Sequence, residues 1–176
     1  MPFKTEQHLF NQAIASPFMR NIVDAIKYPT YAFAEPKGLF GIPDLVVANV
    51  EHRNGQAIII RSFAFEMKLS NWKRAITQAY RYRAFANLVY VVIDRHFLKP
   101  ALLNIEDFVR SNIGLISIDQ SGFLHIHHAP RFEVPYSYEL EIKFRKTVIG
   151  EQVGDMVYKP ELMVWNSSAV NAINPQ

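Results

Sequence analysis

Two strongly apolar segments, separated by one amphipathic segment, constrain the fold of this chain most. Residues 57–67 (AIIIRSFAFEM) are rich in β-branched and aromatic side chains, and residues 88–93 (LVYVVI) are apolar without a break. Both runs predict strands, and the second is typical of a strand buried on both faces. Residues 71–87 carry apolar side chains at helical spacing, after a cap at Ser70 or Asn71. This strand–helix–strand unit predicts a parallel pair joined by a right-handed crossover.

The flanking segments extend this unit into an α/β domain. Residues 45–50 (LVVANV) predict a strand, and Asn54-Gly55 predicts a hairpin that returns to residues 57–67. Further expected elements are helices over 5–14, 17–27 and 104–111, strands over 31–35, 115–119 and 123–127, and a strand or helix within 131–146. We therefore expect one domain over residues 1–165, with a core over about 31–95, and a frayed tail over 166–176. Its fold class is α/β, a central mixed sheet of about four or five strands flanked by helices.

Composition excludes several kinds of function. The 176 residues include no cysteine, which excludes disulfides, thiolate metal sites and cysteine nucleophiles. The net charge of +3 is compatible with a polyanionic partner without requiring one. No apolar run reaches the roughly 18 residues of a membrane-spanning helix, and the first residues lack the apolar core of a signal peptide. We expect a soluble, cytoplasmic protein with no membrane partner.

Charged residues occur at the ends of two of the expected strands. Asp44 follows Pro43 at the start of one strand, and Glu66 and Lys68 end the next. Residues two apart on a strand point to the same face, so Glu66 and Lys68 should lie together, and the hairpin could bring Asp44 alongside Glu66. We expect Ile58, Ile60 and Ala64 on that same face.

Charges at the edge of an apolar core cost free energy unless they are paired. Two carboxylates suit Mg²⁺, with the backbone carbonyl of Met67 as a third protein ligand and phosphate oxygens completing the shell. Lys68 would then orient a water or neutralise charge that develops on the phosphoryl group. The alternative is structural: an ion pair between Glu66 and Lys68 at a strand end, with Asp44 capping a turn.

The helix after Lys68 combines basic and aromatic residues. Arg74, Gln78 and Arg81 form one stripe at helical spacing, and Tyr82 lies one turn after Gln78. Lys73 and Arg83 add positive charge. This pattern is typical of a surface that contacts phosphates, and also of a solvated helix face whose tyrosines pack against the sheet.

Taken together, these residues resemble the PD-(D/E)XK nuclease superfamily, which has the restriction-endonuclease-like fold. The resemblance covers about Glu35 to Ile93 and consists of Gly41-Ile42-Pro43-Asp44-Leu45-Val46, a hairpin, Phe65-Glu66-Met67-Lys68, Gln78-Ala79-x-x-Tyr82 and a closing apolar strand. It implies metal ligation by Asp44 and Glu66, a catalytic role for Lys68, and a Gln78 that orients the site or contacts substrate. Many members carry one more acid upstream, for which Glu35 is the preferred candidate and Glu6 the alternative.

The resemblance implies a nuclease that uses Mg²⁺, with Mn²⁺ as a substitute, to hydrolyse phosphodiester bonds, most simply in DNA. Its nucleic-acid-binding residues would be Lys73, Arg74, Arg81, Tyr82 and Arg83. A different class of function stays open on the same scaffold: a catalytically silent nucleic-acid-binding or assembly module. A third hypothesis is a homodimer joined through aromatic residues of the C-terminal region, Phe132, Tyr136, Tyr138 and Phe144. DNA or RNA, single or double strands, and endonuclease or exonuclease action all stay open.

Two other kinds of site receive less support. His125 and His127 share one strand face and could bind a transition metal, although titrating histidines on an exposed strand are the simpler interpretation. A serine hydrolase is not indicated, because the chain has no Gly-x-Ser-x-Gly motif.

Overall fold

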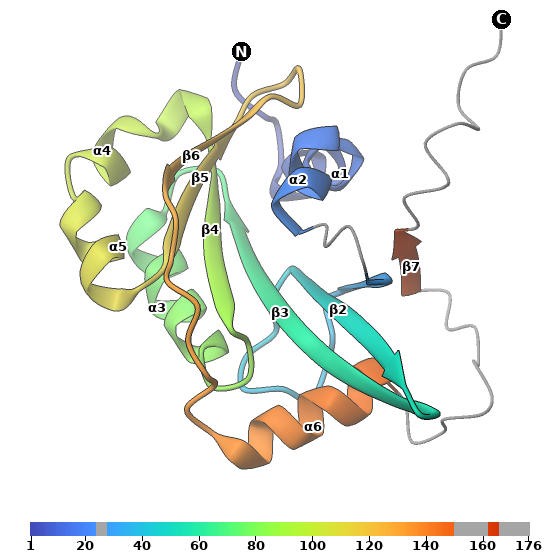
Figure 1. Ribbon diagram of the computed structural model, residues 1–176. Coiled ribbons are helices and arrows are strands. Elements are labelled where there is room, and N and C mark those ends of the chain that lie inside the picture. The colour runs from blue at the N-terminus through green and yellow to red at the C-terminus, as the bar shows by residue number, and fades with distance from the viewer. Residues whose placement is uncertain (24–27, 150–161, 166–176) are drawn as a thin grey trace, which may run out of the picture.

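A seven-stranded mixed sheet forms the centre of the molecule, with helices on both faces (Figure 1). The computed structural model describes residues 1–23, 28–149 and 162–165. The strands are ordered β6-β5-β4-β3-β2-β1-β7. Their bounds are β1 Thr30–Ala34, β2 Leu45–Arg53, β3 Gln56–Lys68, β4 Leu88–Asp94, β5 Gly114–Ile118, β6 Leu124–His128 and β7 Leu162–Trp165. The α/β class is confirmed, and the sheet is larger than the four or five strands predicted.

The central strand–helix–strand unit has the parallel pairing that the sequence predicts. β3 and β4 are parallel and are joined by α3 (Trp72–Tyr82), while β2 and β3 form an antiparallel hairpin. Asn71 begins α3 as its N-cap, because its side chain accepts a hydrogen bond from the backbone N–H of Arg74 at 3.2 Å. The helix ends at Tyr82 rather than near Asn87. Residues 84–86 are buried in a turn that leads directly into β4.

The helices cover the sheet in two layers (Figure 1). α1 (Glu6–Ala15) and α2 (Pro17–Val23) pack on one face, through Leu9, Ala13, Met19 and Val23. The other face is covered by α3 and by α4 (Lys99–Leu102), α5 (Ile105–Ser111) and α6 (Tyr138–Ile149). The sheet is therefore buried on both sides, which explains the unbroken apolar run of β4.

A β-bulge in the central hairpin changes which side chains share a face. Asn49 pairs with Arg61, but the next residue, Val50, pairs with Ile59. The extra residue, Ile60, interrupts the alternation of side chains. Ile59 consequently packs against the same cluster as Ala64, and Ile60 is 37% exposed. The prediction that Ile58 and Ile60 share the face of Ala64 is therefore wrong.

The C-terminal half is partly as expected. The helix α5 and the antiparallel β5–β6 hairpin are confirmed. The uncertain segment 131–146 becomes an irregular stretch followed by α6, and the short 3₁₀ helix η1 (Arg95–Phe97), α4 and β7 were not anticipated. The predicted end of the second helix, residues 24–27, and the predicted tail, 166–176, lie outside the described residues.

β3 extends beyond its parallel neighbour. Its pairing with β4 begins at Phe63, so residues 56–62 have no β4 partner. The side chain of Asn87 takes the place of a strand at one position, where its Oδ1 accepts a hydrogen bond from the Ser62 N–H at 3.0 Å. Across residues 1–23, 28–149 and 162–165, no helix has both the length and the apolarity needed to cross a bilayer.

Candidate active site

A buried carboxylate lies at the carboxyl end of β3. Glu66 is only 1% exposed. Its Oε1 is 2.9 Å from Nζ of Lys68, and its Oε2 accepts a hydrogen bond of 2.5 Å from the hydroxyl of Tyr82 on α3. Both oxygens of this carboxylate are therefore held by protein groups, as a buried charge requires.

Asp44 lies beside this pair because of the hairpin register. Its backbone N–H donates to the carbonyl of Phe65, and its Oδ2 accepts a 2.6 Å hydrogen bond from the N–H of Met67. Burial and the negative charge of Glu66 raise the pKa of Asp44 to about 6, although Met67 and Lys68 act in the opposite direction. The sequence and the structure agree in bringing Asp44, Glu66 and Lys68 together.

Lys68 is the central cation of the cluster. Its Nζ lies 2.9 Å from Glu66, 3.2 Å from Oε2 of Glu6 and 3.1 Å from the backbone carbonyl of Met67. Burial by itself would lower the pKa of Lys68, but the hydrogen bond and charge of Glu66, with the charges of Asp44 and Glu6, raise it. Lys68 is therefore held firmly in its protonated form.

The third acid of the cluster is Glu6 rather than Glu35. Glu6 belongs to the first turn of α1 and reaches Lys68 from the opposite helical layer. Glu35 is exposed, and its described link to the site is a backbone hydrogen bond to the carbonyl of Asp44. The sequence left both acids open and favoured Glu35, because it lies closer to Asp44 along the chain.

The charges of this cluster suit a divalent cation. Three carboxylates (Glu6, Asp44, Glu66) face one ammonium (Lys68), so the fully ionised cluster carries −3 + 1 = −2. The pKa of Asp44 is raised first by burial and then by the negative charge of Glu66. Among the described residues, no three Asp, Glu or His side chains form a ready-made metal centre. A cation held by Asp44, Glu66 and the Met67 carbonyl would have to share atoms that Lys68 contacts here.

Two of the residues expected to bind nucleic acid, Tyr82 and Arg83, make contacts within the protein instead. Tyr82 is 1% exposed, and its hydroxyl lies 3.1 Å from the carbonyl oxygen of Ile42 as well as 2.5 Å from Glu66. Burial and the neighbouring Glu66 raise its pKa. Arg83 donates to the backbone carbonyl of Ser111 and pairs with Glu133. Tyr82 therefore positions Glu66, and Arg83 ties α3 to the C-terminal half.

The other α3 residues remain available. Lys73, Arg74 and Arg81 are exposed. Lys73 lies over the ring of Trp72, with Nζ 5.6 Å from the centroid. Gln78 is half-buried, and its Oε1 is a buried acceptor without a hydrogen-bond partner among the described residues. A buried acceptor without a partner is uncommon in folded proteins and costs free energy through desolvation.

The two minor candidate sites lie elsewhere. The rings of His125 and His127 are 4.6 Å apart, and Nε2 of His127 is 2.8 Å from the Ser117 hydroxyl. Burial, followed by the charges of His125 and Arg95, lowers the pKa of His127. Within the described residues this pair gains no third metal-ligating side chain.

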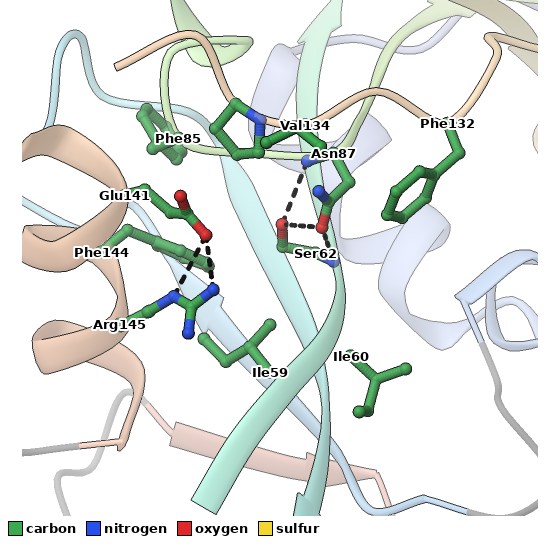
Figure 2. Close-up of a pocket in the computed structure, with 11 residues that line it drawn as sticks. Ile59, Ile60, Ser62, Phe85, Asn87, Phe132, Val134, Glu141, Phe144 and Arg145 are labelled. Carbon is green, nitrogen blue, oxygen red and sulfur yellow. Dashed lines mark hydrogen bonds and ion pairs between the residues drawn. The ribbon is translucent and has the colours of Figure 1, made fainter. Parts of the chain in front are cut away.

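The proposed aromatic interface is only partly exposed. Phe144 is 1% exposed and belongs to the core, whereas Phe132, Tyr136 and Tyr138 are 56%, 56% and 75% exposed. Phe132 and Phe144 line a cavity of about 200 Å³ between β3 and α6, beside the Glu141–Arg145 ion pair (Figure 2). None of the acid-cluster residues lines this cavity.

No protein-family model matches the sequence, and no curated protein matches it. Among solved structures, the fold is similar to that of a protein of unknown function from Silicibacter pomeroyi, with 13% sequence identity and a TM-score of 0.49. The match covers 90% of this chain and 100% of the other.

Proposed function

We propose that this protein is a Mg²⁺-dependent nuclease of the PD-(D/E)XK type that hydrolyses phosphodiester bonds in DNA. The observation that carries the proposal is the net negative cluster at the end of β3, in which Asp44 and Glu66 share one site with Lys68. Carboxylates of this kind usually ionise fully at neutral pH only when a cation or a hydrogen-bond donor compensates them. A divalent cation supplies that charge, and the waters it carries supply the donors.

Each residue has a distinct role in this proposal. Asp44, Glu66 and the Met67 carbonyl would hold the cation, which when bound neutralises the carboxylates and polarises the phosphoryl group. Lys68 would turn its ammonium from Met67 and Glu6 to a non-bridging phosphate oxygen and neutralise the charge that develops there. Tyr82 keeps Glu66 in place through the 2.5 Å hydrogen bond. Lys73, Arg74 and Arg81 would bind flanking phosphates.

The decisive experiment compares the wild-type protein with Lys68→Ala, Asp44→Asn and a surface control, Lys99→Ala. Linear, circular and single-stranded DNA, and RNA, are incubated with Mg²⁺ or Mn²⁺, and with EDTA. We expect cleavage by the wild type and by Lys99→Ala, and a loss of roughly 10²–10³-fold in Lys68→Ala, the size seen when one charge-stabilising donor is removed.

Metal binding is measured separately, by Mn²⁺ titration in a calorimeter. We expect one Mn²⁺ per chain in the wild type and weaker binding in Asp44→Asn. An intact Mn²⁺ site without cleavage of any substrate would favour the silent nucleic-acid-binding module. Cleavage unchanged in Lys68→Ala would remove the proposed mechanism.

A further inference from the structure

The loop that leads into Asp44 exposes two large apolar side chains next to the acid cluster. We call residues 35–44 the Asp44 loop. Phe40 is 48% exposed and Ile42 is 53% exposed, only four and two residues before Asp44. Large apolar side chains that are exposed close to a charged site are a feature of contact surfaces.

The Asp44 loop is fixed to the residues of the cluster. Its ends are joined by a hydrogen bond from the Glu35 N–H to the Asp44 carbonyl. Gly41 has φ +93° and lies against the ring of Tyr82, so that an added Cβ would be 2.8 Å from Cε1. The carbonyl of Ile42 is 3.1 Å from the same hydroxyl that holds Glu66. The positions of Phe40 and Ile42 are therefore set by the residue that positions the buried carboxylate.

Basic side chains surround the exposed part of the loop. The guanidinium of Arg81, on α3, lies 5.9 Å from the centroid of the Phe40 ring. Lys143, on α6, lies beside Gly38, since a Cβ added to Gly38 would be 3.8 Å from Nζ of Lys143. Lys37, within the loop, is exposed. The loop passes between these two helices, and its two acids, Glu35 and Asp44, are at its ends (Figure 1).

An aromatic ring flanked by cations can contact both the base and the phosphate of a nucleotide. Bases stack on aromatic side chains, and phosphates pair with Lys and Arg, without any requirement for a particular sequence. The bases of a duplex already stack on one another, so only unpaired bases offer their faces to Phe40. We infer that the Asp44 loop binds unpaired bases of single-stranded DNA, or of a frayed end, through Phe40 and Ile42. This inference rests on the proposed function, because it places those bases beside the phosphodiester that would be cut.

The test measures binding without cleavage. Lys68→Ala protein serves as the background. In EDTA, fluorescence anisotropy follows its binding to a fluorescein-labelled single-stranded oligonucleotide and to a blunt duplex annealed from two strands with G·C-rich ends. Phe40→Ala and Ile42→Ala are compared with Phe40→Trp and with Tyr138→Ala, an exposed aromatic on α6. We expect Phe40→Ala to weaken single-strand binding roughly 10-fold, as the loss of one base–aromatic stack does. Phe40→Trp and Tyr138→Ala should retain it.

Duplex affinity should change less than about twofold in all variants, because a duplex offers no free base face. A 2-aminopurine in the oligonucleotide should show quenching that Phe40→Ala removes. Equal affinity of Phe40→Ala and its background for single strands would overturn the inference, as would equal losses on single strands and duplex. Absence of single-strand binding would do so as well, and would leave an apolar protein partner for the loop.

The two proposals can fail separately. If the wild type cuts DNA but Phe40→Ala binds single strands normally, only the role of the loop is wrong. If Phe40→Ala loses single-strand binding but the wild type cuts nothing, the loop binds nucleic acid and the nuclease proposal fails. Melting temperatures of all variants, measured by circular dichroism, show whether each remains folded.

Discussion

At the scale of single residues, the Tyr82 hydroxyl links two parts of the candidate site. It donates to Glu66 and lies next to the carbonyl of Ile42, and its side chain is almost fully buried. A buried donor of this kind satisfies an ionised carboxylate that would otherwise be strongly disfavoured. The position of Glu66 therefore depends on a residue from another element.

Removal of this hydroxyl should be measurable in the folded protein. In Tyr82→Phe, Oε2 of Glu66 loses its donor, and we expect the free energy of unfolding to fall by about 1–3 kcal/mol. Urea denaturation followed by circular dichroism measures the change. Tyr80→Phe is the matched control, since Tyr80 is 49% exposed, and it should be neutral. Equal stability of the two variants would show that the hydroxyl does not hold Glu66.

The raised pKa of Asp44 predicts a pH dependence of stability in the metal-free protein. Between its ordinary value of 3.8 and about 6, the folded protein retains a proton that the unfolded chain releases. The folded state then binds more protons, so stability falls as pH rises through this window, by up to about 3 kcal/mol. In EDTA, the wild type should lose stability between pH 4 and pH 7, whereas Asp44→Asn lacks this titrating group. The free energy of unfolding of Asp44→Asn should therefore rise relative to that of the wild type over this pH range. A difference independent of pH would contradict the raised pKa.

The sequence predicts part of this site and misses the rest for a physical reason. Asp44, Glu66 and Lys68 follow from strand alternation and one hairpin, which are local patterns. Glu6 contacts Lys68 although the two residues are 62 positions apart in the sequence, and no local spacing indicates that contact. Tyr82 could have been placed in the core, because it continues the buried stripe of Ala75 and Ala79.

At the scale of elements, the packing of the Asp44 loop on α3 requires a glycine. Gly41 combines a left-handed φ of +93° with a close approach to the Tyr82 ring. Either feature alone would disfavour a side chain, and together they fix the path of the loop. The sequence pattern Gly-Ile-Pro-Asp therefore serves the geometry of the loop as well as the start of β2.

Gly41→Ala should be more costly than an equivalent change at a turn with free space. Gly55 also has a positive φ, of +75°, but nothing lies within 4 Å of an added Cβ. We expect Gly55→Ala to lower the free energy of unfolding by about 1 kcal/mol, through backbone strain alone. Gly41→Ala should carry the same strain and a further cost of about 1–3 kcal/mol, because the new methyl group overpacks against the Tyr82 ring. Thermal denaturation of both variants gives the comparison. Equal costs would mean that the ring of Tyr82 moves aside freely.

The β-bulge shows why element boundaries were predicted better than their side-chain faces. The apolar pattern of residues 57–67 located β3, but an alternating assignment places every second residue on one face. One extra residue, Ile60, reverses the assignment for the first half of the strand. Its position depends on the pairing with β2, and the sequence of β3 alone does not specify it.

At the scale of the whole molecule, the acid cluster joins the two helical layers at one end of the sheet. α1 supplies Glu6 from one layer and α3 supplies Tyr82 from the other, and both reach residues of β3. The N-terminal segment is attached nearby, since the N–H of Phe3 donates to Asp94 at the end of β4 at 2.7 Å. The candidate site is therefore complete only when α1 is docked.

Docking of α1 can be weakened from its buried side. Leu9 is fully buried, and Leu9→Ala should lower the free energy of unfolding by about 2–5 kcal/mol. Leu103→Ala, at a position that is 76% exposed, should have little effect. Hydrogen exchange should show faster exchange in residues 6–15 of Leu9→Ala than in β4. Uniform acceleration across the sheet would instead show that α1 and the sheet unfold together.

Among the residues that the structure describes, the part of β3 before Phe63 pairs on one side only, with β2. Residues 56–62 turn one row of backbone donors and acceptors away from β2, and such a row can template pairing with another chain. The bulge at Ile60 interrupts this row, and Oδ1 of Asn87 accepts the hydrogen bond of the Ser62 N–H in place of a neighbouring strand. Asn87 and Ile60 thus leave fewer backbone groups of this edge free to pair with another chain.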